Sequence, residues 1–410
     1  MYVLRFFNLL FVIISFSFVP VLSSCIASDN HNSYAQTLKA GLRVGAERTE
    51  VYIGLLDTKR VAVVGNHSSL VSGVHLVDTL LRLGINVVKV FGPEHGFRGD
   101  LPDGETVASG VDPTTGIEIV SLYGKYRKPN PNHLKNVDII VFDMQDVGVR
   151  FYTYISTMSL VMEAAAENGI PVLVLDRPNP HRHYIDGPVL EPGYSSFVGM
   201  HQVPVVYGMT IGEYALMVNG QGWLANGVKC NLKVIAIENY FSDTKYIFPV
   251  PPSPNLPNMR SVYLYPSLCF FEGTLISVGR GTDFPFEVFG HPKLPSEKYT
   301  FSFQPKITSA STNPPLLGQL CNGLSLKHLT EDYYKSVRSI NLDYLLEGYS
   351  DYPEKAYFFN NYFNRLAGTA SLQEQIKNGV AESAIRASWQ PRIEEFRQIR
   401  SKYLLYCDFR

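Results

Sequence analysis

The chain is poor in cysteine and nearly neutral, and both features exclude classes of protein. It has 410 residues, only 5 of them cysteine, and a formal net charge of −1. No Cys-x-x-Cys pair is present, so the sequence does not support structural zinc or thioredoxin-like redox chemistry. We expect Cys230, Cys269, Cys321 and Cys407 to be buried free thiols. The near-zero charge argues against a nucleic-acid partner.

Several well-known catalytic motifs are also missing. No Gly-x-Gly-x-x-Gly follows the first apolar run, which argues against a dinucleotide cofactor. The chain has no P-loop lysine motif, no His-Glu-x-x-His and no Gly-x-Ser-x-Gly turn of serine hydrolases. It has no internal repeat and no second apolar segment of membrane length. We therefore expect no cofactor.

The N-terminus reads as a targeting segment. Arg5 is the only positive charge before the apolar run 6–21, which is followed by Leu22-Ser23-Ser24-Cys25. This pattern is typical of a signal peptide and resembles the bacterial lipoprotein signal. It predicts a signal at 1–24, a lipid on Cys25 that anchors the protein to a membrane, and a linker at 25–40. An exported protein facing the periplasm would follow. The alternative is cleavage near Ala27, which would leave a free protein.

Residues 61–240 alternate between apolar strand patterns and helical patterns. Alternation of this kind predicts parallel pairing and a doubly wound α/β sheet. The expected strands cover 61–64, 86–91, 137–142, 172–175, 203–206 and 232–237. The expected helices cover 71–83, 154–167 and 212–218.

A proline-rich stretch at 249–257 interrupts this alternation. Proline at such density cannot continue a helix or a central strand. We therefore predict a domain at 41–248 and a smaller α+β domain at 249–410 that closes the site. Residues 260–350 look like mixed strands and loops, and two helices are expected at 371–387 and 391–405, with Pro391 starting the second.

An acid and a histidine follow the second expected strand. Gly92-Pro93 ends this strand, and Glu94 and His95 come next. Ligands bind at the carboxyl ends of the strands in open α/β sheets, on loops held by a rigid scaffold. Glu94 is therefore the first candidate for a working acid.

Polar residues also follow the other strands. Asp143, Gln145, Asp146, Arg150 and Tyr152 come after the third strand. Taken singly, Asp146 could serve as an N-cap or a loop hydrogen bond, and Arg150 could form a structural salt bridge. A cluster of this kind is better explained by a binding site.

The fourth strand ends in Asp176, Arg177 and Asn179, and the first ends at Asn66. Four apolar strands thus end in polar side chains at what should be one edge of one sheet. Such convergence predicts a binding crevice.

The predicted second domain adds Glu272 and Arg280. Arg280 stands between Gly279 and Gly281, where the backbone can approach a ligand closely. Its guanidinium could hold an anion by paired hydrogen bonds. The alternative is a structural ion pair with Glu272 or Asp283.

Acids at a crevice, without phosphate or dinucleotide signals, point to general acid catalysis. A glycosidic bond needs a proton on its leaving oxygen, and a carboxylic acid with a raised pKa can supply it. Glu94 follows apolar strand residues, where such a pKa is plausible. His95 with Asp143 is a weak metal signature, so we expect no metal.

These segments together resemble the exo-acting β-N-acetylmuramidases, from about Gly41 to Tyr406. Gly92-Pro93-Glu94-His95-Gly96 and Phe142-Asp143-x-Gln145-Asp146-x-Gly148-x-Arg150 are specific in combination. The further matching segments are Ser121–Gly124, Phe151–Ser156, Asp176–Pro180, Gly208–Thr210, Pro252–Asn255 and Ser277–Thr282. Gly65–Ser68 replaces a usual Thr-Asn-Gln-Thr, and Val206-Tyr207 replaces a usual Arg-His.

The resemblance implies a Rossmann-like domain, a smaller second domain and a site between them. Glu94 matches the family's proposed catalytic glutamate, with Asp143 or Asp146 as its partner. The family cleaves N-acetylmuramic acid from the non-reducing ends of peptidoglycan fragments. Arg150, Arg177 or Arg280 would then bind the lactyl carboxylate. Asn66, Asn179 or Asn255 would bind the acetamido group.

We therefore predict a glycoside hydrolase with Glu94 as general acid and peptidoglycan-derived sugars as substrate. Two rival hypotheses stay open at this point. One is a metal-dependent hydrolase acting on the peptide or acetyl group of the same fragments. The other is a non-catalytic glycan-binding lipoprotein.

Overall fold

The computed structural model describes residues 41–409, except 94–95, 99–108, 242–243 and 245. The predicted signal and linker, and the side chains of Cys25, Glu94 and His95, therefore lie outside the described residues. The chain from Gly41 onward forms one compact unit. The domain boundary expected at 248–249 stays a prediction.

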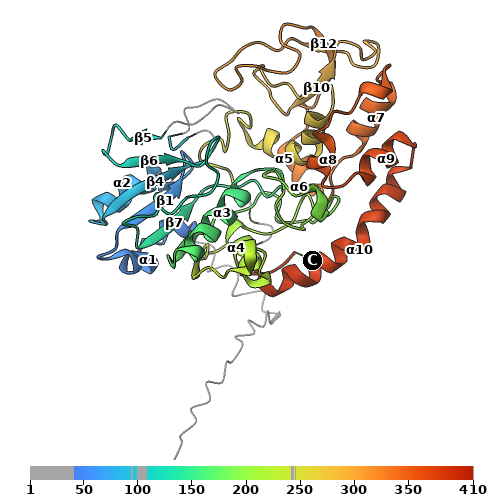
Figure 1. The fold of residues 1–410 in the computed structure, drawn as a ribbon. Coiled ribbons are helices and arrows are strands. Elements are labelled where there is room, and N and C mark those ends of the chain that lie inside the picture. Colours follow the sequence, from blue (N-terminus) through green and yellow to red (C-terminus); the bar gives the residue numbers. More distant parts are fainter. Residues whose placement is uncertain (1–40, 94–95, 99–108, 242–243, 245, 410) are drawn as a thin grey trace, which may run out of the picture. The chain divides into compact units, whose positions relative to one another are not determined.

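A seven-stranded, mostly parallel sheet is the main element of the fold (Figure 1). Its spatial order is β5-β6-β4-β1-β7-β8-β9. Only the edge strand β5 runs antiparallel to its neighbour. The strands are β1 (Val61–Gly65), β4 (Val87–Gly92), β5 (Gly110–Val111), β6 (Glu118–Ser121), β7 (Ile139–Asp143), β8 (Val172–Leu175) and β9 (Leu232–Ile235).

The strand order reverses between β1 and β7. The chain winds outward from β1 through β4 to β6, returns to pair β7 with β1, and then continues to β8 and β9. Gly65 at the end of β1 is in register with Asp143 at the end of β7. A crevice for ligands is expected at the carboxyl ends of strands at such a switch point. The predicted doubly wound sheet is confirmed.

Both faces of the sheet are covered, which explains the continuous apolar strands. In β1, Ala62 and Val64 belong to one buried cluster, and Val61 and Val63 belong to another. Helices α3 (Tyr154–Glu167) and α4 (Ile211–Gln221) contribute to the first cluster. Helices α1 (Thr49–Leu56) and α2 (Leu76–Arg82) contribute to the second.

The rest of the chain combines a small sheet with helices. Strands β10 (Val288–His291), β12 (Cys321–Ser325) and β11 (Phe301–Phe303) pair antiparallel in that order. A hairpin of β2 (Leu70–Val71) and β3 (Val74–His75) follows β1. The further α-helices are α5 (Met259–Leu268), α6 (Glu331–Ser336), α7 (Asp343–Asp351), α8 (Phe363–Ala367), α9 (Ser371–Lys377) and α10 (Glu382–Arg400). Short 3-10 helices are η1 (Gly45–Glu47), η2 (Pro192–Tyr194), η3 (Ala225–Gly227), η4 (Cys269–Gly273), η5 (Lys355–Tyr357) and η6 (Ser401–Tyr403).

Several expected elements differ from the structure. The helix expected at 371–387 is divided, because α9 ends at Lys377, Gly379 adopts a φ of +67°, and α10 begins at Glu382. The helix expected at 71–83 begins only at Leu76, because the β2–β3 hairpin turns at Gly73 with a φ of +84°. The strand expected at 203–206 is reduced to isolated bridges from Val206 to Val149 and Asp186. Residues 259–268, expected as strand or loop, form α5.

The prediction that Pro391 starts the last helix is wrong, because Pro391 lies inside the 19-residue helix α10 (Figure 1). A proline inside a helix costs about 3 kcal/mol. A buried stripe on the same helix, at intervals of three and four, offsets this cost by packing on the core. Its members are Ile385, Trp389, Ile393 and Phe396.

Three of the cysteines, Cys230, Cys269 and Cys321, are buried thiols, as expected, but the expectation is wrong for Cys407, which is exposed near the C-terminus. Within the described ranges, no helix has the length and apolar character needed to cross a membrane.

The C-terminal tail is fastened to the edge of the large sheet by buried polar groups. The carbonyls of Tyr406 and Cys407 accept hydrogen bonds from Arg182, which also pairs with buried Glu213. The Tyr406 hydroxyl donates to Asp176 Oδ2 at 2.6 Å and accepts from the Ile237 amide at 2.8 Å. The tail thus completes the hydrogen bonding at the end of β8.

We expect Tyr406→Phe to lower the free energy of unfolding by about 1–3 kcal/mol, because the buried Asp176 loses a donor. Urea unfolding monitored by circular dichroism measures this. The control is Tyr357→Phe, whose residue is 71% exposed. Equal unfolding midpoints for wild type and Tyr406→Phe would show that this hydroxyl does not hold the tail.

Candidate active site

The polar residues predicted to converge do lie at one edge of the sheet. Asn66, Asp143 and Asp176 occupy the carboxyl ends of the neighbouring strands β1, β7 and β8. Glu94 and His95 come after β4, which lies on the other side of β1, but they are outside the described residues. The convergence of the described members supports the crevice, although their side chains differ in what they contact.

Asp143 forms a buried ion pair with Arg177. Arg177 Nε donates to Asp143 Oδ1 at 2.5 Å, and Nη2 donates to Oδ2 at 2.8 Å. The two side chains are 1% and 0% exposed. Burial opposes the charge of Arg177, but the adjacent Asp143 outweighs it and raises the pKa of the guanidinium. Arg177 also donates to the carbonyl of Leu70, so its contacts lie inside the protein.

Asp176 is held by groups of the scaffold. Its carboxylate accepts hydrogen bonds from Thr210 Oγ1, the Gly212 amide and the Tyr406 hydroxyl. Burial raises its pKa to about 7, against the effect of these donors. Its contacts join β8, α4 and the C-terminal tail.

Asp146 is buried and only partly hydrogen-bonded. Its Oδ2 accepts from the Tyr207 hydroxyl at 2.6 Å and from the Gly148 amide at 2.7 Å, while Oδ1 has no partner. Burial raises its pKa to about 6. Tyr207, which stands where the resemblance expects histidine, is therefore the direct partner of a predicted catalytic carboxyl.

Arg150 is fully buried, and its terminal nitrogens bind backbone carbonyls. Nη1 donates to Pro188 and Val203, and Nη2 donates to Leu366 and Ala367. Burial lowers its pKa to about 9. These bonds span up to 217 positions of the chain and give Arg150 a scaffold role in the structure. The structural salt bridge considered as the alternative for Arg150 is not what the structure shows, because the acceptors of this guanidinium are backbone carbonyls.

Three predicted amide side chains are also engaged within the protein. Asn66 donates to the Tyr154 hydroxyl and accepts from Ser68. Asn179 donates to the Met209 carbonyl and accepts from the His181 amide. Gln145 Nε2 donates to two carbonyls, while its buried Oε1 has no partner.

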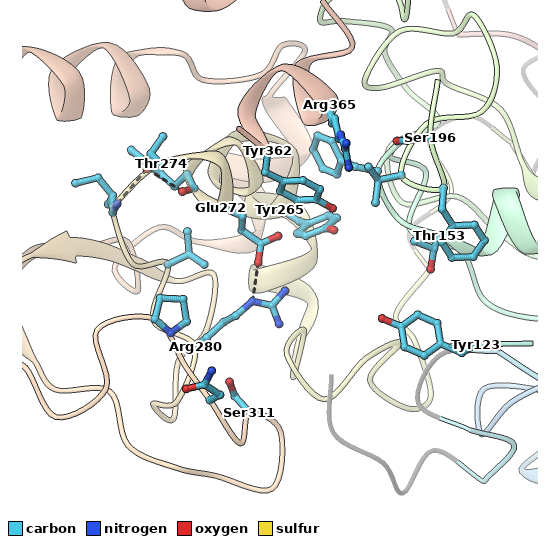
Figure 2. A pocket seen from close by; sticks show the side chains of 18 of the residues that line it. Tyr123, Thr153, Ser196, Tyr265, Glu272, Thr274, Arg280, Ser311, Tyr362 and Arg365 are labelled. Carbon is cyan, nitrogen blue, oxygen red and sulfur yellow. Dashed lines mark hydrogen bonds and ion pairs between the residues drawn. The ribbon is translucent and has the colours of Figure 1, made fainter. Parts of the chain in front are cut away.

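A pocket of ≈ 710 Å³ lies between segments of the first and second halves of the chain (Figure 2). Tyr123 and Thr153 face it from loops after β6 and β7, across from Arg280 and Ser311 (Figure 2). Its volume is in the range of small-molecule sites. The other lining residues are Arg127, Phe151, Ser196, Phe197, Val198, Tyr265, Phe271, Glu272, Thr274, Ile276, Val278, Thr312, Asn313, Pro315, Tyr362 and Arg365.

The charged lining is mostly positive. It contains Arg127, Arg280 and Arg365 but, among the described lining residues, a single acid, Glu272. Arg280 Nε donates to Glu272 Oε1 at 2.6 Å, and Cys269 Sγ donates to Oε2 at 3.4 Å. The ion pair considered as an alternative for Arg280 is therefore present, and it holds the guanidinium at the pocket wall.

A smaller recess of ≈ 60 Å³ adjoins this pocket. Phe151, Thr153, Tyr265 and Arg280 line both cavities. The recess is also lined by Tyr152, Tyr154, Ser253, Asn255, Leu256 and Phe286.

Four of the predicted site residues thus line a cavity: Glu272 and Arg280 in the large pocket, and Tyr152, Asn255 and again Arg280 in the recess. Arg127, Tyr265 and Arg365 also line the large pocket but are not among the residues predicted from the sequence. Tyr123 and Thr153 lie within segments that carried the resemblance, which was the available signal for them. Arg365 lies on the five-residue helix α8, which contains no motif that indicates a binding residue.

No cluster of three or more His, Cys, Asp or Glu side chains suited to a metal ion occurs in the part of the chain that the structure describes. The weak metal signature of His95 with Asp143 involves an undescribed residue, so this observation does not address it.

The doubly wound sheet, its polar edge and the arginine-rich pocket define an α/β protein with a positively charged pocket. Comparison with models of known protein families identifies the family within this class. The N-terminal model of the exo-beta-N-acetylmuramidase NamZ matches residues 61–260, and the C-terminal model matches 263–406. The chain belongs to this family.

Individual relatives agree with this assignment. The peptidoglycan beta-N-acetylmuramidase NamZ of Bacillus subtilis is 40% identical over 371 residues, covering 86% of this chain and 88% of that protein. A DUF1343 family protein from Bacteroides fragilis is 44% identical, with a TM-score of 0.83 over 90% of this chain and 100% of its own. A second one from the same organism is 30% identical, with a TM-score of 0.75 over 89% and 99%. The predicted fold class and the enzyme class, a glycoside hydrolase, are confirmed.

The raised pKa of Asp146 predicts a pH-dependent stability. Its folded pKa of about 6 exceeds the ordinary value of 3.8, so the unfolded chain releases this proton first. The contribution of Asp146 to the free energy of unfolding is fully present below about pH 4 and is lost as the pH rises to about 6. This loss is on the order of 3 kcal/mol, and we expect it to be absent in Asp146→Asn.

Urea unfolding at several pH values between 4 and 8 measures the difference. The control is Asp57→Asn, which changes an exposed residue of the same type. Parallel pH profiles for wild type and Asp146→Asn would contradict a raised pKa.

Proposed function

We propose that this enzyme removes N-acetylmuramic acid from the non-reducing ends of peptidoglycan fragments by hydrolysing its glycosidic bond. Membership in the exo-beta-N-acetylmuramidase family supports the reaction. The B. subtilis relative, which carries peptidoglycan in its name, supports the substrate class.

The observation that carries this proposal is the pocket at the carboxyl edge of the sheet. Its volume of ≈ 710 Å³ suits a ligand of sugar size. Tyr123, Thr153, Tyr265 and Ser311 offer hydroxyl groups, which can both donate to and accept from sugar hydroxyls. Three arginines against one glutamate favour an anionic sugar over a neutral one.

Arg280 is our candidate for the lactyl carboxylate of muramic acid. Of the three arginines that the sequence suggested, it alone is among the residues lining the pocket. Arg150 and Arg177 bind carbonyls and Asp143 inside the protein. The ion pair with Glu272 fixes the orientation of the guanidinium, which suits a planar, two-point contact with a carboxylate.

Glu94 acts as the general acid in this proposal. It protonates the bridging oxygen while water attacks the anomeric carbon, directly or after an intermediate. The place of Glu94 after β4, next to the switch point, supports this role.

The buried ion pair of Asp143 and the buried position of Asp146 favour electrostatic support of the site by these two groups. Their hydrogen bonds inside the protein make a direct role as base or nucleophile less consistent with the geometry. His95 and Gln145 would assist in positioning at the same edge.

Export and membrane attachment through Cys25 complete the proposal. The pattern Leu22-Ser23-Ser24-Cys25 after a long apolar run supports it. A lipid-anchored enzyme facing the periplasm would meet cell-wall fragments directly.

Replacing Glu94 by glutamine keeps the size of the side chain and removes its acidic proton. We expect kcat on a chromogenic β-N-acetylmuramide to fall roughly 10²- to 10⁴-fold, while binding of free N-acetylmuramic acid is retained. Steady-state kinetics and calorimetric binding measure the two quantities. Glu118→Gln, at an exposed position on β6, is the control. Near-normal turnover of Glu94→Gln would exclude this role.

The lipid anchor is tested by metabolic labelling with radioactive palmitate in a bacterial host. We expect label and membrane sedimentation for the full-length chain and neither for Cys25→Ala, because the acyl chains require this thiol. Cys407→Ala, which alters another cysteine that is exposed, should label like the wild type. Unlabelled wild-type protein would favour simple cleavage near Ala27.

A further inference from the structure

The small recess beside the main pocket has a mixed lining, in which aromatic and aliphatic side chains alternate with the polar residues Thr153, Ser253, Asn255 and Arg280. Phe151, Leu256 and Phe286 are each at most 3% exposed, and the rings of Tyr152 and Tyr154 complete the wall. The Tyr152 hydroxyl is turned to the carbonyl of Pro252 at 2.7 Å. Such a cavity suits a small substituent that combines an apolar part with a polar group.

One polar group of the recess has an unmet hydrogen bond. Asn255 is 2% exposed, and its Nδ2 donates to the carbonyl of Ala310 at 3.0 Å. Because only the amide nitrogen can donate to that carbonyl, the orientation of the side chain is fixed. Its Oδ1 is buried and has no partner. A buried acceptor without a donor is unfavourable and calls for an explanation.

The other two asparagines that the sequence analysis considered differ from Asn255 in this respect. Asn66 Oδ1 accepts from the amide and the hydroxyl of Ser68. Asn179 Oδ1 accepts from the amide of His181. Both side chains are satisfied within the protein, and neither is among the residues lining the two cavities. Of these three asparagines, Asn255 is the one that lines a cavity and has a buried oxygen without a partner.

We propose that the recess is the subsite for the 2-acetamido group of the sugar, with Asn255 Oδ1 accepting its N–H and the aromatic and aliphatic walls holding its methyl group. This inference rests on the proposed function and names the residue that selects a 2-acetamido sugar. The volume of the recess agrees with this assignment. A cavity of ≈ 60 Å³ holds roughly four to six groups of the size of a water molecule, and an acetamido group has four heavy atoms.

The position of Arg280 agrees with the same arrangement. Arg280 lines both the recess and the main pocket, so it lies where the two cavities meet. In muramic acid the acetamido and lactyl groups are on adjacent ring carbons. A sugar whose acetamido group enters the recess would therefore carry its lactyl carboxylate toward Arg280, with the ring in the larger pocket.

A comparison of substrates tests the proposal with the full-length enzyme. Three chromogenic glycosides are needed: the N-acetylmuramide, its 2-deoxy analogue without the acetamido group, and the N-acetylglucosaminide without the lactyl group. For Asn255→Ser we expect kcat/KM to fall about 10-fold on the two acetamido sugars and little on the 2-deoxy analogue. For Arg280→Lys we expect the loss on the two lactyl sugars and little on the glucosaminide.

The ratios of kcat/KM between the substrates separate recognition of a sugar substituent from a general structural effect of the substitution. A merely structural role of Asn255 would lower all three values equally, and that outcome would overturn the proposal. If the wild-type enzyme released nothing from the N-acetylmuramide, the proposed function itself would fail. If the wild type is active but Asn255→Ser and Arg280→Lys lose kcat/KM in the same proportions on the three glycosides, only the assignment of the subsites fails.

A substitution that enlarges the recess should increase activity on a sugar with a longer acyl chain, and poor folding cannot produce such an increase. We expect the wild type to reject an N-butanoyl analogue by at least about 10-fold relative to N-acetyl, because the longer chain exceeds the cavity. Leu256→Ala should reduce this discrimination by opening the wall next to Asn255. Equal activity of the wild type on both acyl chains, or unchanged discrimination in Leu256→Ala, would show that the acyl group binds elsewhere.

Discussion

The buried ion pair of Asp143 and Arg177 is the interaction on which the carboxyl edge of the sheet depends. It joins the end of β7 to the end of β8, and a further bond from Arg177 to the Leu70 carbonyl reaches the hairpin that follows β1. Two buried charges are costly to desolvate, and removing one would leave the other unpaired at a cost of about 3–5 kcal/mol. Three strand ends are thereby kept together at the point where the strand order reverses.

The acids at this edge and the charged groups of the pocket have different roles. Asp143 and Asp176 bind groups of the scaffold, whereas the charged wall of the pocket is formed by Arg127 from the first half of the chain and by Glu272, Arg280 and Arg365 from the second. Loops and helices far along the sequence bring the residues that line the pocket to this sheet. Because both halves line the pocket, neither builds the proposed site alone.

Local patterns were sufficient for elements whose signals come from nearby residues. The strand β8 and the helix α3 have the predicted bounds, since an apolar run and regular spacing are decided within each segment. Helix α10 continues through Pro391 because its apolar stripe packs on a core that the local sequence does not reveal. For Arg150 the same limit applies: its carbonyl acceptors lie up to 217 positions away, so the local motif, which predicts a substrate contact, cannot reveal these contacts within the protein.

A crystal structure of the Glu94→Gln protein with a bound N-acetylmuramyl disaccharide tests the central claim most directly. We predict the muramic acid ring in the ≈ 710 Å³ pocket, with the residue 94 side chain about 3 Å from the bridging oxygen. Arg280 should contact the lactyl carboxylate. A sugar bound away from the carboxyl edge of the sheet, or a bridging oxygen out of reach of residue 94, would contradict the account.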